Sequence, residues 1–327
     1  MNKKLRWGIL GTGGIANAFA KDLVATGHSV TAVGSRTLES SRAFASTYGI
    51  GEAFGSYEEL VAYEGIDAVY VSTPHPFHAT NARLVLEAGK HALVEKPFTL
   101  NASEARDVVE LAERRGLVVL EAMWTRWLPH MVRLREIIRA GAIGEVSTLI
   151  ADHTKRLPDD PKHRINAPEL GGGALLDLGI YPISFAWDLF GQPSLIRANA
   201  TFTSTGVDQS STVILSYDGG RSAVTHSASN VHGSNTAVVM GSKGRIEIDP
   251  VWYTATSFTV LGNDGRVSER FERPLTTRGM EYQVMELESL VAQGKTSGTI
   301  LPVQETVKIM ECLDEVRRQI GLKYPGE

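Results

Sequence analysis

The chain contains little cysteine, carries no strong charge of either sign and has no long apolar run. Cys312 is the only cysteine among its 327 residues, which excludes an intramolecular disulfide and a cysteine-cluster metal site and suits a reducing compartment. The formal net charge of −4 argues against a nucleic-acid-binding surface, which needs a basic field. No apolar run reaches the roughly 18 residues of a membrane-spanning helix.

The amino terminus also lacks the apolar stretch of a secretion signal. Residues 1–5 include two lysines, and the glycine-rich segment Gly11–Gly14 follows soon afterwards. We therefore expect a cytoplasmic protein that binds neither nucleic acid nor membranes.

What the chain does contain is the composition of a globular protein, with 43% apolar and 21% charged residues. At roughly 150 residues per domain, its length corresponds to about two domains. Segments of helical periodicity separate five short apolar runs, residues 7–10, 30–33, 68–71, 91–94 and 117–120. This alternation predicts βαβ units and a parallel sheet.

The pattern changes after Glu121. About six period-2 segments lie between residues 195 and 271, and glycine-containing hairpin turns separate some of them. Helices are expected over residues 129–139, 174–189, 281–292 and 303–320, and Pro182 could kink or restart the second of these. The fold class is therefore α/β: a Rossmann domain over 1–124, then an α+β domain over 125–327 with a large, open, mainly antiparallel sheet.

Residues 11–16 read Gly-Thr-Gly-Gly-Ile-Ala, a G-x-G-x-x-A motif between a predicted strand and a predicted helix. Gly11 permits the tight turn, Gly13 allows a pyrophosphate to approach the backbone, and the helix start offers N–H groups to phosphates. The context favours a dinucleotide-binding turn over a plain glycine-rich turn. The cofactor-binding candidates of this motif are Gly11, Thr12, Gly13, Gly14 and Ile15.

The end of the second strand indicates which dinucleotide binds. NAD sites place an acidic residue there to hold the ribose hydroxyls, but here Ser35 and Arg36 follow the strand and the nearest carboxylate is Glu39. A guanidinium suits a 2′-phosphate. We therefore expect NADP, with NAD possible.

Three residues are candidates for the chemistry. Lys96 comes two residues after the fourth apolar run, at the sheet edge where ligands of open α/β sheets bind. Asp177 and Tyr181 lie four residues apart, on one face of the expected helix. A nearby ammonium lowers the pKa of a phenol, so a Lys–Tyr pair could accept the proton of an alcohol. The same residues would also fit roles without chemistry: Lys96 as an exposed lysine at a strand end, and Tyr181 as a buried residue of an amphipathic helix.

Several motifs together resemble the glucose–fructose oxidoreductase, inositol dehydrogenase and rhizopine-catabolism (Gfo/Idh/MocA) family. They are residues 11–16, Ser72-Thr73-Pro74-His75, Ala88-Gly89-Lys90-His91, Glu95-Lys96-Pro97 and Gly172-Gly173-Ala174-Leu175-Leu176-Asp177. Residues 121–127, 177–181, 241–244 and 315–321 are similar to its dimeric dihydrodiol dehydrogenase and NADP-dependent D-xylose dehydrogenase branch, which has tyrosine at the Tyr181 position where most of the family has histidine.

The resemblance implies an NADP(H)-dependent oxidoreductase that moves a hydride between nicotinamide and a carbinol or carbonyl carbon of a sugar, polyol or diol. Lys96 and Tyr181 would form the catalytic pair, and Asp177 would orient the substrate. The cofactor would contact Ser72, Thr73, Pro74, His75, His78, Glu95, Lys96, Trp124 and Arg126. The substrate pocket would include Trp124, His153, Asp177, Tyr181 and Trp252.

Some alternatives stay open. Imine or enone reduction, NAD-dependent inositol oxidation, and a catalytically silent dinucleotide-sensing regulator would all fit this fold. His153 stands where the dihydrodiol enzyme has an aromatic wall, which favours a sugar or polyol. His75 and His78 have no third ligand nearby in sequence, so we expect no metal. An open sheet face usually finds a partner, and the resemblance implies that this partner is a second copy in a homodimer.

Overall fold

The computed structural model describes residues 4–327, so the expectation for the first residues of the chain lies partly outside the described range. The chain divides into two compact units. Unit 1 comprises residues 1–124 and 277–310, and unit 2 comprises residues 125–276 and 311–327. Residues 277–310, which the sequence pattern assigned to the second domain, thus belong to the first unit. Each unit is described by itself below.

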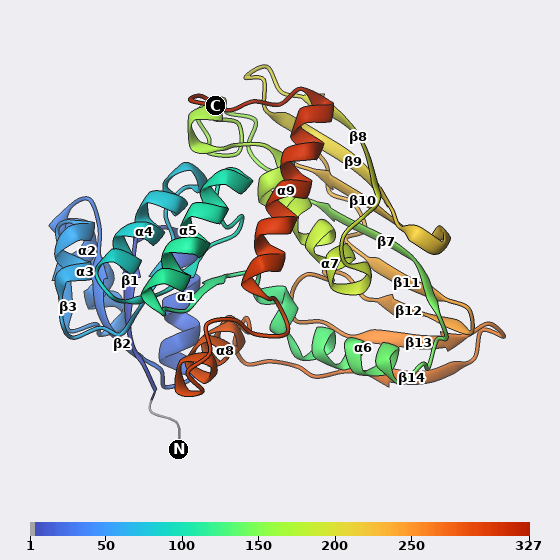
Figure 1. The fold of residues 1–327 in the computed structure, drawn as a ribbon, viewed down its shortest axis with the longest axis horizontal. Helices are drawn as coiled ribbons and strands as arrows, with labels where there is room; N and C mark the ends of the chain where they lie inside the picture. Colours follow the sequence, from blue (N-terminus) through green and yellow to red (C-terminus); the bar gives the residue numbers. More distant parts are fainter. Residues whose placement is uncertain (1–3) are drawn as a thin grey trace. The chain divides into compact units, whose positions relative to one another are not determined.

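Unit 1 is built on a six-stranded sheet in the order β3-β2-β1-β4-β5-β6, with parallel pairing throughout (Figure 1). This is the strand order of a dinucleotide-binding Rossmann sheet. The strands are β1 Arg6–Leu10, β2 Ser29–Gly34, β3 Glu52–Phe54, β4 Ala68–Val71, β5 His91–Val94 and β6 Val119–Glu121. The helices are α1 Gly14–Ala25, α2 Leu38–Tyr48, α3 Tyr57–Ala62, η1 His75–Phe77, α4 His78–Glu87, α5 Ala102–Arg115 and α8 Glu281–Ala292.

Local sequence explains these elements. The central strand β4 is buried along its whole length, and β1 and β5 are buried except at their first residues, because helices cover both faces of a parallel sheet. In α5, the Asn101 side chain accepts a hydrogen bond from the Glu104 backbone N–H at 3.0 Å, and Gly116 ends the helix in the left-handed conformation. In α1 the Asp22 carboxylate accepts hydrogen bonds from the backbone N–H groups of Arg278 and Met280, which ties the start of α8 to this unit.

Unit 2 is built on an eight-stranded sheet in the order β14-β13-β12-β11-β7-β10-β9-β8. Only the β7–β10 pair is parallel, so the sheet is mainly antiparallel as predicted. The strands are β7 Val146–Thr154, β8 Leu195–Phe202, β9 Asp208–Ser216, β10 Ser222–Ala228, β11 Ala237–Gly241, β12 Gly244–Ile248, β13 Phe258–Gly262 and β14 Val267–Phe271. The helical segments are α6 Pro129–Arg139, η3 Pro168–Leu170, the π-helix η4 Leu175–Gly179, α7 Ile180–Phe190 and η5 Asp218–Gly220. Two more divide between the units, η2 Trp124–Trp127 at 124/125 and α9 Val303–Ile320 at 310/311.

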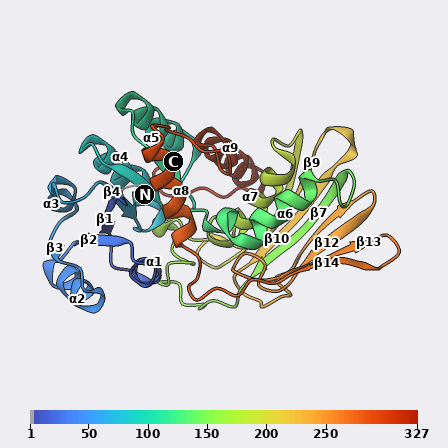
Figure 2. The same ribbon diagram turned by 90° about the horizontal axis from the view of Figure 1, so that it is seen from below.

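The two faces of the second sheet differ. α6 and α7 lie on one face, as Figure 1 and Figure 2 both show. The strand side chains of Leu149, Val213 and Val239 are buried. Within unit 2 no helix covers the opposite face. There, cross-strand pairing aligns Ile214, Val224, Ile150 and Val238 in one continuous row over four strands.

The expected helix over 174–189 has an unexpected start. It begins with a π-helical turn, and Pro182 stands in the first turn of the α-helix that follows, where proline is tolerated. The structure adds the edge strand β3 and the short helix α3, neither of which the sequence pattern indicated. Among the described residues, no helix combines the length and the apolar character needed to cross a bilayer.

Candidate functional site

The glycine turn of unit 1 has the geometry of a phosphate cradle. Gly11 has a φ of +105°, and a Cβ there would lie 2.9 Å from the Ser72 hydroxyl oxygen, so only glycine fits. Cβ atoms at Gly13 and Gly14 would meet nothing within 4 Å, which leaves open space beside the start of α1. No side chain caps that helix. The residues therefore fit a dinucleotide pyrophosphate on the helix N-terminus.

The end of β2 lies beside this turn. The Ser35 and Thr12 hydroxyl oxygens are 3.5 Å apart, and Ser35 is buried whereas Arg36 is exposed. Burial raises the pKa of Tyr57, and the charge of Arg36 opposes this with a smaller effect. Arg36 thus brings a cation to the position where NAD sites carry an acid.

His78 links the two segments that follow β4 and β5. Its ring nitrogens lie 2.7 Å from the carbonyl oxygens of Thr73 and Pro97, and the residue is fully buried. Burial lowers the pKa of His78 to about 4, although the two carbonyls favour the charged ring. These contacts give His78 a positioning role, and direct contact with a cofactor stays a prediction. His75 lies next to it, with ring centroids 5.7 Å apart.

Lys96 follows β5, at the carboxyl end of the parallel sheet. Its backbone N–H donates to Glu95 Oε2 at 3.1 Å, and the Tyr70 hydroxyl donates to Glu95 Oε1. The Lys96–Pro97 peptide bond is cis. Glu95 thus shapes the backbone around Lys96. Its carboxylate is buried between these partners.

Trp124 and Arg126 lie in different environments. Trp124 is buried in unit 1, with the Arg278 guanidinium 5.6 Å from its ring centroid. Arg126 belongs to unit 2, where its guanidinium binds the Ser184 hydroxyl, the Ser184 carbonyl and the Asp188 carboxylate. The expected position of Arg126 near a nicotinamide stays a prediction, and these contacts make it a structural cation under α7.

Asp177 and Tyr181 lie about one turn apart on the helix that starts in the π-turn, a feature frequent at functional sites. Asp208 in β9 holds the start of this helix, because its Oδ2 accepts a hydrogen bond from Leu175 N at 2.7 Å. Burial raises the pKa of Asp208 to about 7, although the helix N–H groups favour its charged form. The Tyr324 hydroxyl donates to Gly172 O at 2.6 Å and holds the preceding loop.

The rings of His153 and Tyr253 lie beside Tyr181. His153 in β7 meets Tyr181 edge-on, with ring centroids 5.0 Å apart, and Tyr253 stacks on His153 at 3.5 Å. Tyr253 also lies 5.6 Å from Tyr181. Trp252 is fully buried: its indole N–H donates to Asp152 O, and its ring stacks on Phe185. Lining of the pocket by Trp252 stays a prediction, whereas its neighbour Tyr253 is the residue beside Tyr181.

Asp177 has a charged partner that the sequence analysis missed. Arg164, in the loop before η3, places its Nη2 3.0 Å from Asp177 Oδ2. Asp177 is buried, so the guanidinium compensates a charge that burial would otherwise disfavour. No periodic pattern could have identified Arg164, Tyr253 or Asp208, because all three pairings are long-range and two of the residues lie in loops.

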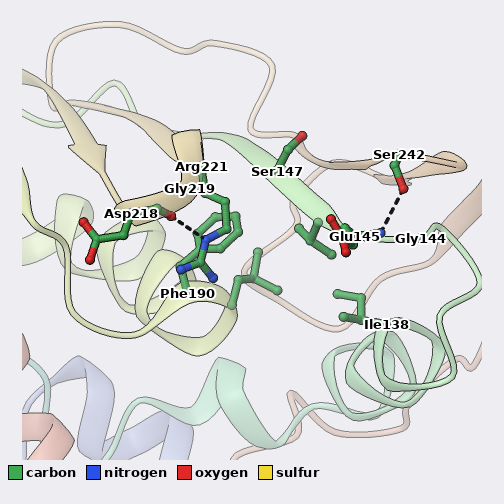
Figure 3. A pocket seen from close by; sticks show the side chains of 11 residues that line it. Ile138, Gly144, Glu145, Ser147, Phe190, Asp218, Gly219, Arg221 and Ser242 are labelled. Carbon is green, nitrogen blue, oxygen red and sulfur yellow. Dashed lines mark hydrogen bonds between the residues drawn. The ribbon is translucent and has the colours of Figure 1, made fainter.

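Unit 2 also contains a surface pocket of ≈ 670 Å³ beside α6, α7 and β7 (Figure 3). Arg221 lies over the Phe190 ring there and donates to Asp218 O, while the Ser242 hydroxyl accepts from Glu145 N. None of the candidate residues lines it. Among residues 4–327 no group of three or more His, Cys, Asp or Glu side chains could hold a metal ion.

The two units together carry the parts of a dehydrogenase: a dinucleotide cradle with a lysine at the sheet edge in one, and a tyrosine–carboxylate pair in the other. Comparison with known proteins agrees. The GFO_IDH_MocA profile, described as an oxidoreductase family with an NAD-binding Rossmann fold, matches residues 5–123. The profile of the GFO/IDH/MocA C-terminal domain matches residues 131–247. The chain belongs to the Gfo/Idh/MocA family of oxidoreductases.

Particular relatives cover almost the whole chain. Trans-1,2-dihydrobenzene-1,2-diol dehydrogenase of Bos taurus is 35% identical in an alignment 340 residues long that covers 99% of this chain and 99% of its own. D-xylose 1-dehydrogenase (NADP(+)) of Hypocrea jecorina is 35% identical over 98% of this chain and 93% of its own. The aldose-aldose oxidoreductase of Caulobacter crescentus, solved with glycerol, superimposes with a TM-score of 0.87 at 25% identity over 97% of each chain. The resemblance inferred from the sequence is thereby confirmed.

Proposed function

We propose that this oxidoreductase uses NADP(H) to transfer a hydride between nicotinamide and a carbinol or carbonyl carbon of a sugar, polyol or diol. The observation that carries the proposal is the position of Tyr181 one helical turn from Asp177, whose carboxylate pairs with Arg164, on a chain whose other unit has a dinucleotide cradle with Arg36 at its edge. The names of the relatives, which include a diol and an aldose dehydrogenase, support the substrate class.

In this proposal the site residues have separate roles in the reaction. When bound, NADP⁺ supplies the hydride acceptor. Tyr181 takes the proton of the reacting hydroxyl, and Lys96 stabilises the phenolate form by its charge. Asp177 accepts a hydrogen bond from a second substrate hydroxyl and so orients the carbinol carbon. His153 and Tyr253 form an aromatic wall beside Tyr181.

We further propose a homodimer formed through the open face of the second sheet. The row of Ile214, Val224, Ile150 and Val238 is apolar, and Ile150 and Ile214 are exposed in the single chain. Exposed apolar patches of this kind mark interaction sites. The pairing of His226 with Thr212, 2.9 Å apart, places a polar rim next to the row. A cytoplasmic location suits an enzyme that uses NADP(H) and has one buried, unpaired cysteine.

A substrate screen tests the proposed activity. Polyols, aldoses and dihydrodiols are offered with NADP⁺ and with NAD⁺, and NADPH or NADH formation is followed by absorbance. Turnover of at least one sugar or diol, faster with NADP⁺, is the expected result. Tight cofactor binding without turnover of any alcohol would instead support a dinucleotide-sensing regulator. A clear preference for NAD⁺ and inositol, or turnover of imines and enones alone, would support the corresponding rival activity.

A further inference from the structure

Arg164 is an exposed residue with an unusually fixed position. Its guanidinium bonds to the Asp177 carboxylate at 3.0 Å, while its own side chain is 54% exposed and that of Asp177 is 7% exposed. One partner is therefore open to incoming molecules, whereas the other is nearly enclosed.

The backbone on both sides of Arg164 is anchored. Gly173 N donates to Ile165 O at 2.8 Å, and Gly172 N donates to Ala167 O at 3.0 Å. A Cβ at Gly172 would lie 2.7–2.9 Å from three carbonyl oxygens of this loop, including that of Arg164. Glycine therefore lets the loop pack close to the start of the helix that carries Asp177 and Tyr181. Asn166 closes the loop by donating to the carbonyl oxygens of Pro158 and Asp160.

Part of this arrangement serves stability, because the guanidinium compensates the charge of the buried Asp177. On the Arg164 side solvent screens the pair, so the exposed guanidinium also faces incoming molecules. The same loop offers a direct comparison: Arg156 is 55% exposed, pairs with the exposed Asp159 and also donates to Asn230 O. Arg164 differs from Arg156 in that its partner is the buried carboxylate one turn from Tyr181.

We propose that Arg164 is a specificity-determining residue that, together with Asp177, selects substrates with an oxygen on the carbon next to the one oxidised. A guanidinium presents five N–H donors in a rigid fork, and a carboxylate only accepts. The pair thus offers an acceptor and donors side by side, which matches the neighbouring oxygens of a sugar or a 1,2-diol. The inference rests on the proposed function, because it assigns the second oxygen of the substrate that Tyr181 oxidises.

The test compares substrates that differ in one oxygen. D-glucose is paired with 2-deoxy-D-glucose, and trans-1,2-cyclohexanediol is paired with cyclohexanol. The variants are Arg164→Gln, Arg164→Lys and the matched control Arg156→Gln. In each pair that wild type oxidises, we expect the higher kcat/KM for the compound with the neighbouring oxygen, D-glucose or trans-1,2-cyclohexanediol. Arg164→Gln should lower kcat/KM for that compound about 10- to 100-fold, as expected for a lost charged hydrogen bond. For the compound that lacks this oxygen, the loss should be less than about threefold.

Other outcomes have distinct meanings. Partial rescue by Arg164→Lys and no change in Arg156→Gln would support the assignment. Equal losses for the diol and its deoxy analogue would overturn it and leave a purely structural role for Arg164, with the proposed oxidoreductase activity intact. Equal kcat/KM of wild type for both members of each pair would also overturn it. No turnover of any sugar or diol by wild type would refute the proposed function itself, and the inference with it.

Discussion

Replacing Asp188 by asparagine should destabilise the protein by about 3–5 kcal/mol, the usual result of removing one partner from a buried ion pair. Asp188 lies between two arginines, with Oδ1 3.1 Å from Arg126 Nη1 and Oδ2 2.7 Å from Arg135 Nη1. The side chains of Arg126 and Asp188 are only 2% and 6% exposed, so solvent cannot replace the lost charge. Asparagine keeps the shape of aspartate but turns an amide donor toward one of the cations.

Urea denaturation followed by far-UV circular dichroism measures this effect. The matched control is Glu269→Gln, because Glu269 holds Arg133 through two hydrogen bonds of 2.9 Å but both side chains are about a third or more exposed. The control should lose less than about 1 kcal/mol. Equal, small losses in both variants would refute the argument that burial makes the Asp188 network costly to break.

Three further predictions concern the cofactor, the assembly and a buried acid. Arg36→Ala should weaken NADP⁺ binding roughly 10- to 150-fold, the value of a charged hydrogen bond, and leave NAD⁺ binding nearly unchanged; calorimetry giving equal losses for both would contradict a contact with the 2′-phosphate. Wild type should sediment at twice the 35.5 kDa mass of the chain, and Ile150→Asp should shift it toward the monomer, whereas a monomeric wild type at micromolar concentration would contradict the dimer. Burial raises the pKa of Asp208 from 3.8 to about 7, so the folded chain keeps a proton that the unfolded chain loses, and its contribution makes stability fall as pH rises from about 4 to 7. Asp208→Asn should flatten that part of the pH profile of the denaturation midpoint, and an unchanged slope would show that Asp208 does not titrate in this range.

Much of the fold follows from local patterns. The helices Pro129–Arg139, Glu281–Ala292 and Val303–Ile320 have the predicted bounds, because their apolar residues recur at helical spacing over several turns. The strand β3 has only three residues at a sheet edge, too few for any period to show. All five residues of the π-turn Leu175–Gly179 are buried, Asp177 included, so no one-sided pattern distinguishes this turn from an α-helical one.

The candidate site was predictable where a motif fixes a backbone conformation and not where side chains meet across the fold. The Gly11 turn follows from its spacing. The contacts of Arg126 could not be predicted, because its partners Ser184 and Asp188 lie about 60 residues away and no local sequence pattern indicates them. Trp252 and Tyr253 are neighbours in an irregular segment, where sequence does not tell which of two adjacent aromatic side chains points toward Tyr181.

The central claim is that the Tyr181 hydroxyl accepts the proton of the substrate. Tyr181→Phe keeps the ring beside His153 and removes only that hydroxyl. Tyr217→Phe is the matched control, since the Tyr217 ring packs on Phe190 of the same helix and its buried hydroxyl has no hydrogen-bond partner among the described residues.

The decisive measurement is kcat of both variants on the substrate identified by the screen, with NADP⁺ affinity measured alongside. The account predicts that Tyr181→Phe loses about 10²- to 10⁴-fold in kcat, the usual contribution of a general acid or base, while NADP⁺ still binds and Tyr217→Phe turns over like wild type. Turnover by Tyr181→Phe at the wild-type rate would contradict it.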